Sequence, residues 1–190
     1  MIDFTPITEK KINWTRFAAQ FTRQDLIKQT NQITDYILKL IAEATDADVV
    51  FDPHDPEAYD PYAETAEEEY IGWTVGHIIV HLTASNEESA FLAAELARGV
   101  EIEYRRTRWE VPWETITTIE QCRHRLEESR RMLLASLEMW PDTPDLENFY
   151  KTPQGLKVTA LVRFLLGQNH AASHLEQIQD VLRQAKQIPA

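Results

Sequence analysis

The stretch His170-Ala-Ala-Ser-His174-Leu-Glu-Gln177 lies within a longer segment, Leu156 to Gln184, whose apolar residues recur at the spacing of an α-helix. In a helix, residues four apart lie one turn above each other, so His170 and His174 share one face with Gln177. The apolar residues flanking that face are Ala160, Phe164, Ala171, Leu175, Ile178 and Leu182. The two imidazoles are therefore predicted at the edge of a core-facing surface.

Two neutral imidazoles at positions i and i+4 of a helix can chelate one divalent transition-metal ion. Helices also carry two histidines without any metal, so this pair needs a third ligand from another part of the chain. A second pair with the same spacing, His77 and His81, lies in a predicted helix from Thr74, a suitable N-cap, to Arg98, just before Gly99. His81 has apolar neighbours, so a buried core histidine is the alternative interpretation.

The rest of the chain contains two more amphipathic helices, Ile12 to Ala44 and Thr117 to Met139. The second of these begins with a capping box, Thr117-Thr-Ile-Glu120. Asp142 to Gln154 is predicted as a loop, and no segment shows the alternation of a buried strand. These patterns predict an all-α fold, a four-helix bundle with long loops between helices 1 and 2 and between helices 2 and 3. We expect residues 1–190 to form a single domain.

Acidic residues are concentrated in one part of the chain. The sequence has 31 Asp and Glu against 19 Lys and Arg, a formal net charge of −12, and eleven of the acids lie between Glu43 and Tyr70, where no Lys or Arg occurs. Prolines punctuate this acidic segment, which we interpret as a surface loop that binds no metal. The excess of acids argues against a nucleic-acid partner, and the short basic cluster Arg105-Arg106-Thr-Arg108 is interpreted as a solvated loop.

Composition sets further limits. Hydrophobic residues make up 43% and charged residues 26% of the 190 residues, as in globular proteins. No apolar run approaches the ~20 residues that span a bilayer, and no secretory signal is visible, so no membrane partner is expected. Cys122 is the single cysteine, which excludes an internal disulfide and fits a cytoplasmic location. Nothing around Cys122 indicates an activated thiol, so we interpret it as a buried structural residue rather than a nucleophile.

The segment Trp73-Thr-Val-Gly-His-Ile-Ile-Val-His81-Leu82 resembles the second-helix motif of the DinB/YfiT-like family of metalloenzymes. His170-x3-His174-x2-Gln177 is similar to the motif on that family's last helix, and Trp109-Glu-Val-Pro-Trp113-Glu resembles a loop of one branch of the family. The resemblance extends over most of the chain. It implies an up-down-down-up bundle, a three-histidine metal site formed by His81, His170 and His174, and often a homodimer.

The resemblance also implies a class of reaction, because family members include bacillithiol-dependent S-transferases and a mycothiol-dependent isomerase. Two features depart from the family pattern. Many relatives begin the second helix with Trp-Ser-Pro, whereas Thr74-Val75-Gly76 follows the tryptophan here, and the acid on the His81 face is displaced to Glu88. These departures leave the histidine triad intact and leave the catalytic residues unassigned.

Three neutral ligands leave a coordination position open for water or substrate, a feature of catalytic metal sites, and Zn and Ni both suit three imidazoles. The family resemblance and this donor set together favour an enzyme, a thiol-dependent S-transferase or a hydrolase, in which a metal-activated thiol or water attacks a small electrophile. His170 is not followed by the Glu of a zincin protease. The alternative function is a non-catalytic stress-related or interaction bundle with a structural or vestigial metal site. His77 is the alternative ligand to His81, and Gln177 either orients a ligand or is simply polar.

Overall fold

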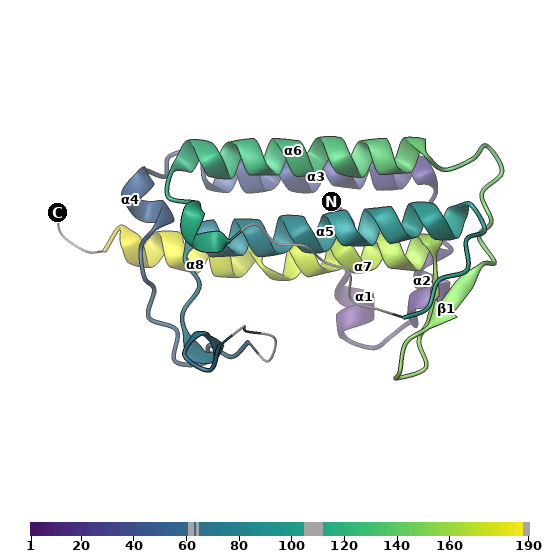
Figure 1. Cartoon of the computed structure of the whole chain (residues 1–190), viewed down its shortest axis with the longest axis horizontal. Helices are drawn as coiled ribbons and strands as arrows, with labels where there is room; N and C mark the ends of the chain where they lie inside the picture. Colours follow the sequence, from purple (N-terminus) through teal and green to yellow (C-terminus); the bar gives the residue numbers. More distant parts are fainter. Residues whose placement is uncertain (61–62, 64, 105–111, 188–190) are drawn as a thin grey trace.

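Four long helical segments form a bundle in the computed structural model, which describes residues 1–60, 63, 65–104 and 112–187 (Figure 1). They are α3 (Arg23–Leu40), α5 (Val75–Ala97), α6 (Ile119–Glu138) and α7 (Ala160–Ser173), which α8 (Leu175–Ala185) continues. α3 and α7–α8 run in one direction and α5 and α6 in the other, so the order is up-down-down-up (Figure 1). The predicted all-α four-helix bundle is confirmed.

Side-chain caps fix where the helices begin. Thr22 and Asp25 form a capping box at the start of α3, in which the backbone N–H of Thr22 donates to Asp25 Oδ2 at 2.8 Å. At α6 the box lies one residue later than the sequence pattern predicted, between Thr118 and Gln121. The reason is that Gln121 Oε1 accepts the backbone N–H of Thr118 at 2.9 Å, a bond that an amide side chain makes as well as Glu.

The prediction of one continuous first helix from Ile12 to Ala44 is wrong. The capping box at Thr22 starts a new helix, and the rings of Phe17 and Phe21 pack on each other with centroids 5.1 Å apart instead of forming a helical stripe. The acidic segment, predicted as a loop, also contains short helices. Before α3 the chain forms two short helices, α1 (Thr5–Thr8) and α2 (Trp14–Ala18). The acidic segment contains α4 (Asp46–Val49) and the 3-10 helix η1 (Glu68–Tyr70).

The last predicted helix, Leu156 to Gln184, is broken at His174, between α7 and α8. A local competition explains the break. The hydroxyl of Ser173 donates to the carbonyl of His170 at 2.7 Å, and the backbone N–H of His174 bonds instead to the carbonyl of Ala171 at 3.3 Å. The helical hydrogen-bond ladder is therefore interrupted at the second histidine of the motif.

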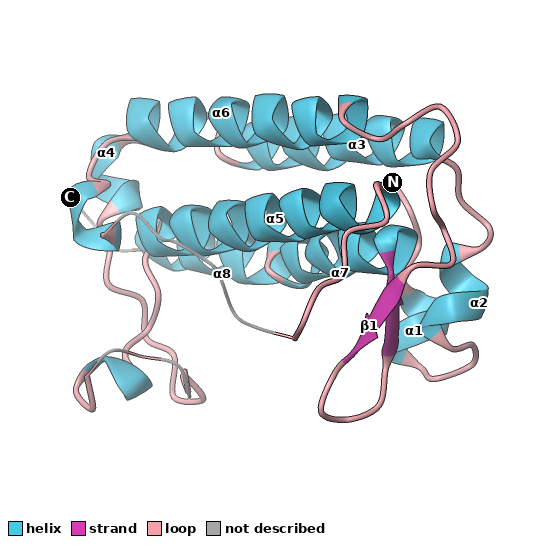
Figure 2. Ribbon diagram, turned by 45° about the vertical axis from the view of Figure 1, so that its right-hand side comes forward, coloured by secondary structure: helices cyan, strands magenta, loops and turns pink. Residues whose placement is uncertain are grey.

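A small hairpin replaces the predicted start of the last helix and part of the predicted loop from Asp142 to Gln154. β1 (Phe149–Lys151) pairs antiparallel with β2 (Lys157–Thr159), with Tyr150 opposite Val158. Figure 2 shows this hairpin beside α1 and α2, at the end of the bundle where α7 begins. The sequence showed no alternating pattern here, because strands of three residues are too short to display one.

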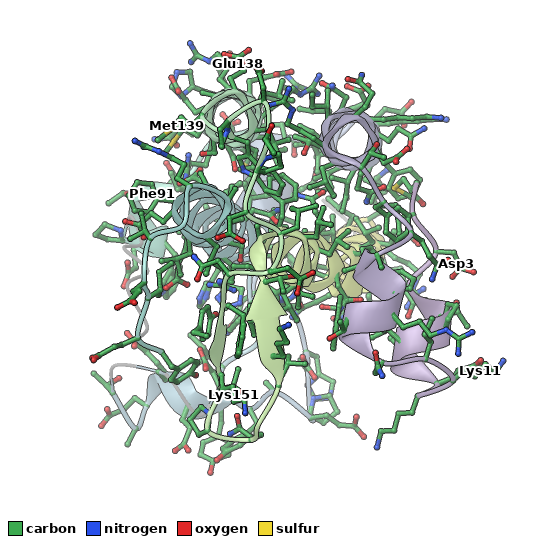
Figure 3. The ribbon with its side chains drawn as sticks, turned by 90° about the vertical axis from the view of Figure 1, so that its right-hand side faces the viewer. Asp3, Lys11, Phe91, Glu138, Met139 and Lys151 are labelled. Carbon is green, nitrogen blue, oxygen red and sulfur yellow. The ribbon has the colours of Figure 1, made fainter. Side chains whose placement is uncertain are left out.

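Viewed along the bundle, α5 and α6 carry the outward-pointing side chains of Phe91, Glu138 and Met139 (Figure 3). Phe91 is 52% exposed, so the outer face of α5 is not part of the core at this point. Within the described residues, none of the helices is both long and apolar enough to cross a membrane.

A buried polar layer divides the core into two apolar clusters. One cluster contains Leu26, Leu133 and Leu165, and the other contains Ile33, Leu126 and Ala171. The residues between them come from all four long helices: Thr30, Asn86, Ser89, Ser129 and Gln168. In this layer, Gln168 Nε2 donates to Asn86 Oδ1 at 3.3 Å. The buried hydroxyl oxygen of Thr30 has no hydrogen-bond partner among the described residues, which makes it an energetic cost.

We predict that Thr30→Val increases the free energy of unfolding by about 1 kcal/mol, because it removes a buried, unsatisfied hydroxyl while keeping the branched shape. Thr34→Val is the matched control, since the hydroxyl of Thr34 donates to the carbonyl of Thr30 at 2.9 Å. The control should lower the free energy of unfolding by a similar amount. Urea titration of both variants measures the difference, and a destabilised Thr30→Val protein would contradict the prediction.

Candidate metal centre

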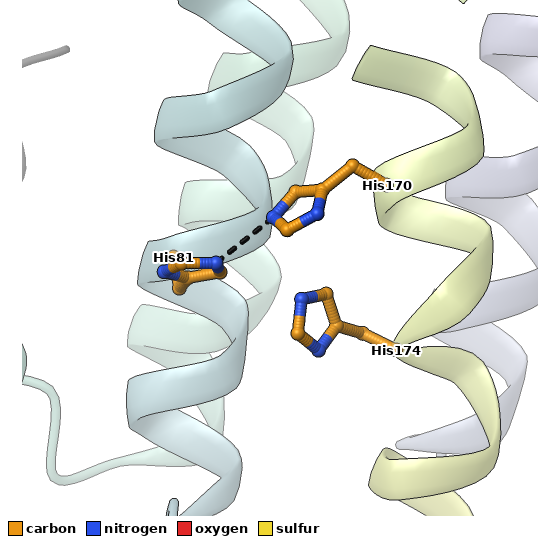
Figure 4. Close-up of side chains that lie close together, drawn as sticks. All are labelled: His81, His170 and His174. Carbon is orange, nitrogen blue, oxygen red and sulfur yellow. Dashed lines mark hydrogen bonds between the residues drawn. The ribbon is translucent and has the colours of Figure 1, made fainter. Parts of the chain in front are cut away.

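Three histidines from α5 and from the α7–α8 junction converge at the edge of the bundle core (Figure 4). His81 projects from α5, His170 from α7, and His174 occupies the junction itself. One nitrogen of each imidazole lies within 4.8 Å of the others, and the Nε2 atoms of His81 and His170 are 2.9 Å apart. The structure thus brings together the three residues that the sequence nominated as ligands.

The donor set and its spacing fit a divalent transition-metal ion. Zn–N bonds of about 2.0–2.1 Å in a tetrahedral site place two ligand nitrogens about 3.3 Å apart, inside the range seen for this triad. His81 is 8% exposed, whereas His170 and His174 are half-buried. The group is therefore anchored in the core on one side and reaches the surface on the other.

Gln177 determines which nitrogen of His174 faces its neighbours. Gln177 Oε1 lies 2.8 Å from His174 Nδ1. A carbonyl oxygen only accepts hydrogen bonds, so Nδ1 carries the proton and the lone pair of the ring is on Nε2. Of the two interpretations open for Gln177, the structure favours the one in which it orients a ligand.

Trp73 forms an aromatic wall beside the triad, a role that sequence reasoning missed. Its ring lies 4.5 Å from the His81 ring and is stacked on His174 with centroids 5.8 Å apart. Trp73 immediately precedes Thr74, whose hydroxyl caps α5 by accepting the N–H of His77 at 3.2 Å. The start of α5 therefore places an apolar surface against two of the three imidazoles. The signal in the sequence that could have indicated this role was the position of Trp73 at the start of the motif that ends at His81 and Leu82.

His77, the alternative ligand, lies outside the triad and within an aromatic stack. Its ring is 4.4 Å from Trp73 and 4.7 Å from Trp113 of the 3-10 helix η2 (Trp113–Thr115), and it is nearly parallel to Trp113. Burial lowers the pKa of His77 to about 4, although the charge of Asp60 opposes this shift. His77 is thus a neutral aromatic ring at neutral pH, and Trp113 stacks on it.

Two further residues considered from the sequence have other partners. Glu88, the acid on the His81 face, pairs with Arg163 of α7, whose Nη2 lies 3.4 Å from Glu88 Oε2. Cys122 is buried in the core, and burial raises its pKa to about 12. The interpretation of Cys122 as a buried thiol is confirmed. Trp109 and the basic cluster from Arg105 to Arg108 lie outside the described residues.

The fold and the histidine cluster define a class of protein: a helical bundle whose core edge can hold a metal ion between its second and last helices. The sequence profile of the DinB superfamily matches residues 11–178, and the chain belongs to this superfamily. Comparison of the chain with curated proteins and with solved structures gives no match.

We predict that His174→Ala abolishes stoichiometric metal binding and weakens affinity by more than about 100-fold, because two imidazoles remain of three. His77→Ala is the control and should keep nearly full metal content, since His77 contributes no nitrogen to the group. Elemental analysis of protein purified without a histidine tag measures both. A His174→Ala protein that retains one metal per chain would exclude the triad.

We predict that Gln177→Leu lowers metal affinity by about 10–100-fold, because His174 Nδ1 loses the acceptor that fixes its ring. Gln179→Leu is the control: Gln179 is exposed on the same helix and donates to the hydroxyl of Tyr36 at 3.2 Å, away from the triad. Competition with a metal chelator gives both affinities. Equal affinities of the two variants would show that Gln177 does not orient the ligand.

Proposed function

We propose that the chain is a divalent-metal-dependent enzyme that adds a thiol or water to a small electrophile, as an S-transferase or a hydrolase. The observation that carries the proposal is the triad at the edge of the core, in which His170 and His174 are half-buried and which offers three imidazole nitrogens within 4.8 Å of one another. Three neutral ligands from one side are typical of a catalytic site with an open coordination position. Membership of the DinB superfamily supports the same function.

His81, His170 and His174 would hold the ion, and Zn or Ni both suit this donor set. A bound divalent ion supplies Lewis acidity, which makes a weakly acidic thiol or water a nucleophile at neutral pH. Gln177 keeps the proton of His174 on Nδ1, away from the neighbouring imidazoles. Trp73 packs against His81 and His174 and excludes water from that side of the site, which strengthens electrostatic interactions there.

The nucleophile comes from the reactants rather than from the protein. Cys122 is buried in the core with a pKa raised to about 12, so it supplies no thiolate at neutral pH. Glu88 forms an ion pair with Arg163, and this pairing makes its carboxylate a poor proton acceptor for a nucleophile at the histidines. We therefore propose a reaction without a covalent enzyme intermediate, in which the proton of the nucleophile leaves to solvent.

The partial exposure of His170 and His174 favours the enzyme over a bundle with a structural metal site, which would enclose its ligands. The proposed partner is a small molecule, for example a low-molecular-weight thiol. The proposed location of the protein is the cytoplasm. The net charge of −12 supports the absence of a nucleic-acid partner. We also propose a homodimer, which the family resemblance suggests.

We predict that removal of the metal abolishes turnover and that Cys122→Ala retains more than about half of it, because the thiol is buried in the core and its pKa is raised to about 12. The measurement is a screen of bacillithiol, mycothiol and glutathione with small electrophiles, followed by assay of chelated, re-metallated and variant protein. Restoration of activity by added Zn or Ni is the control for chelation. Activity that survives chelation and disappears with Cys122→Ala would establish a cysteine nucleophile instead.

A further inference from the structure

Glu88 and Arg163 form a second contact between the faces of α5 and α7 that carry the histidines. Glu88 lies seven residues after His81, and Arg163 lies seven residues before His170. Seven residues make about two helical turns, so each charged residue shares a face with the histidine of its own helix, about 10 Å along the axis. Because α5 and α7 are antiparallel, the packing of these two helices that brings His81 to His170 also brings Glu88 to Arg163.

One donor of the guanidinium, Nε, is not used by the ion pair. Arg163 Nη2 is 3.4 Å from Glu88 Oε2, longer than the roughly 2.7–2.9 Å of a charge-assisted hydrogen bond. Arg163 Nε is buried and has no hydrogen-bond partner in the described part of the chain. A guanidinium has five N–H donors, so a pair built only to join two helices would be expected to use more of them at shorter distance.

Both side chains are at the boundary between core and surface. The side chain of Arg163 is 15% exposed and that of Glu88 is 12% exposed, so the pair is mostly desolvated but still reaches solvent. Tyr150 of β1 is buried beside them: burial raises the pKa of its hydroxyl, Arg163 opposes the shift and Glu88 adds to it. In such a partly desolvated place a cation attracts an anion more strongly than it would in water.

We propose that Arg163 is a specificity-determining residue that binds the carboxylate of a small substrate whose other end lies at the three histidines. The inference rests on the proposed function, because it needs the histidines as the reacting end. A chain with a net charge of −12 repels anions in general, so an anionic substrate requires a local cation. Arg163 supplies it on the same face, and its planar fork matches a carboxylate. Glu88 holds the guanidinium in place when no substrate is bound.

The spacing determines the size of the substrate. An axial separation of about 10 Å between the histidines and Arg163 corresponds to a chain of about eight methylene groups. The test therefore uses protein loaded with Co²⁺ and two ligands of that length, 8-mercaptooctanoate and 8-mercaptooctanol. Dissociation constants come from calorimetry and from the visible spectrum of Co²⁺. We expect the acid to bind about tenfold more tightly than the alcohol.

Arg163→Met should remove this preference by weakening binding of the acid, while Co²⁺ content and affinity for the alcohol stay within about twofold. 3-Mercaptopropionate is too short to reach Arg163, so its affinity should not change in the variant. Equal affinity of acid and alcohol for the unmodified protein, or a preference that persists in Arg163→Met, would overturn the assignment. If the methionine variant does not fold, Arg163→Lys should keep only about a threefold preference, since a point charge replaces the fork.

The proposed function and this subsite fail in different ways. If neither thiol alters the Co²⁺ spectrum, the thiol-dependent reaction is excluded, and octanedioate compared with octanoate by calorimetry then tests the subsite without a thiol. A preference for the dicarboxylate that Arg163→Met removes supports the subsite, whereas equal affinities reject it. Glu88→Gln should keep the carboxylate preference, because it removes the competing acid and leaves the guanidinium. Loss of the preference in Glu88→Gln with folding intact would contradict the assigned roles.

Discussion

The close approach of α5 and α7 is the constraint on which the histidine cluster depends. Gly167 makes it possible, because a Cβ atom at this position would lie 2.6 Å from Ser89 Cβ, closer than real Cβ atoms approach, and 3.0 Å from Asn86 Oδ1. His170 follows Gly167 by about one turn on the same helix. A larger residue at 167 would push the helices apart and separate the nitrogens of His81 and His170, which are 2.9 Å apart. The spacing of the three imidazoles is therefore set by backbone packing rather than by the histidines themselves.

A second close approach builds the aromatic side of the site. A Cβ atom on Gly76 would lie 2.6 Å from the carbonyl oxygen of Ile116, so the segment after η2 packs directly on the first turn of α5. This contact brings Trp113 to His77, and His77 in turn stacks on Trp73 beside the triad. Three consecutive rings thus connect the η2 segment to the site. Gly76 belongs to the segment Thr74-Val75-Gly76, which departs from the Trp-Ser-Pro start of many relatives. The close packing on Ile116 gives a physical reason for a glycine at this position.

Helical periodicity alone places residues four apart on one side, so the sequence predicted which helix faces carry the histidines. It also predicted the bounds of α5, because Thr74 and Gly99 mark them. Its errors arose where local hydrogen bonds overrode periodicity. The Thr22–Asp25 capping box starts a new helix inside a stretch whose apolar residues keep a helical spacing, so periodicity alone did not reveal the boundary. The break at His174 depends on one hydroxyl of Ser173, which no pattern distinguishes from a helical serine. Contacts of Trp73 and Arg163 are tertiary, so spacing along the chain could not reveal them.

The described part of the acidic segment from Glu43 to Tyr70 contacts α8 and lies near His77, which gives its charge a consequence for the site. His54 is joined to α8 through Gln184, whose Oε1 accepts the backbone N–H of His54 at 3.0 Å, and Asp60 is close enough to His77 to influence its pKa. A local excess of acids raises the concentration of divalent cations and lowers that of anions. For the proposed function, such a field would favour metal binding at the histidines and oppose the approach of an anionic substrate. In the proposed subsite, the guanidinium of Arg163, about two turns from the histidines, would offset that repulsion at the surface shared by α5 and α7.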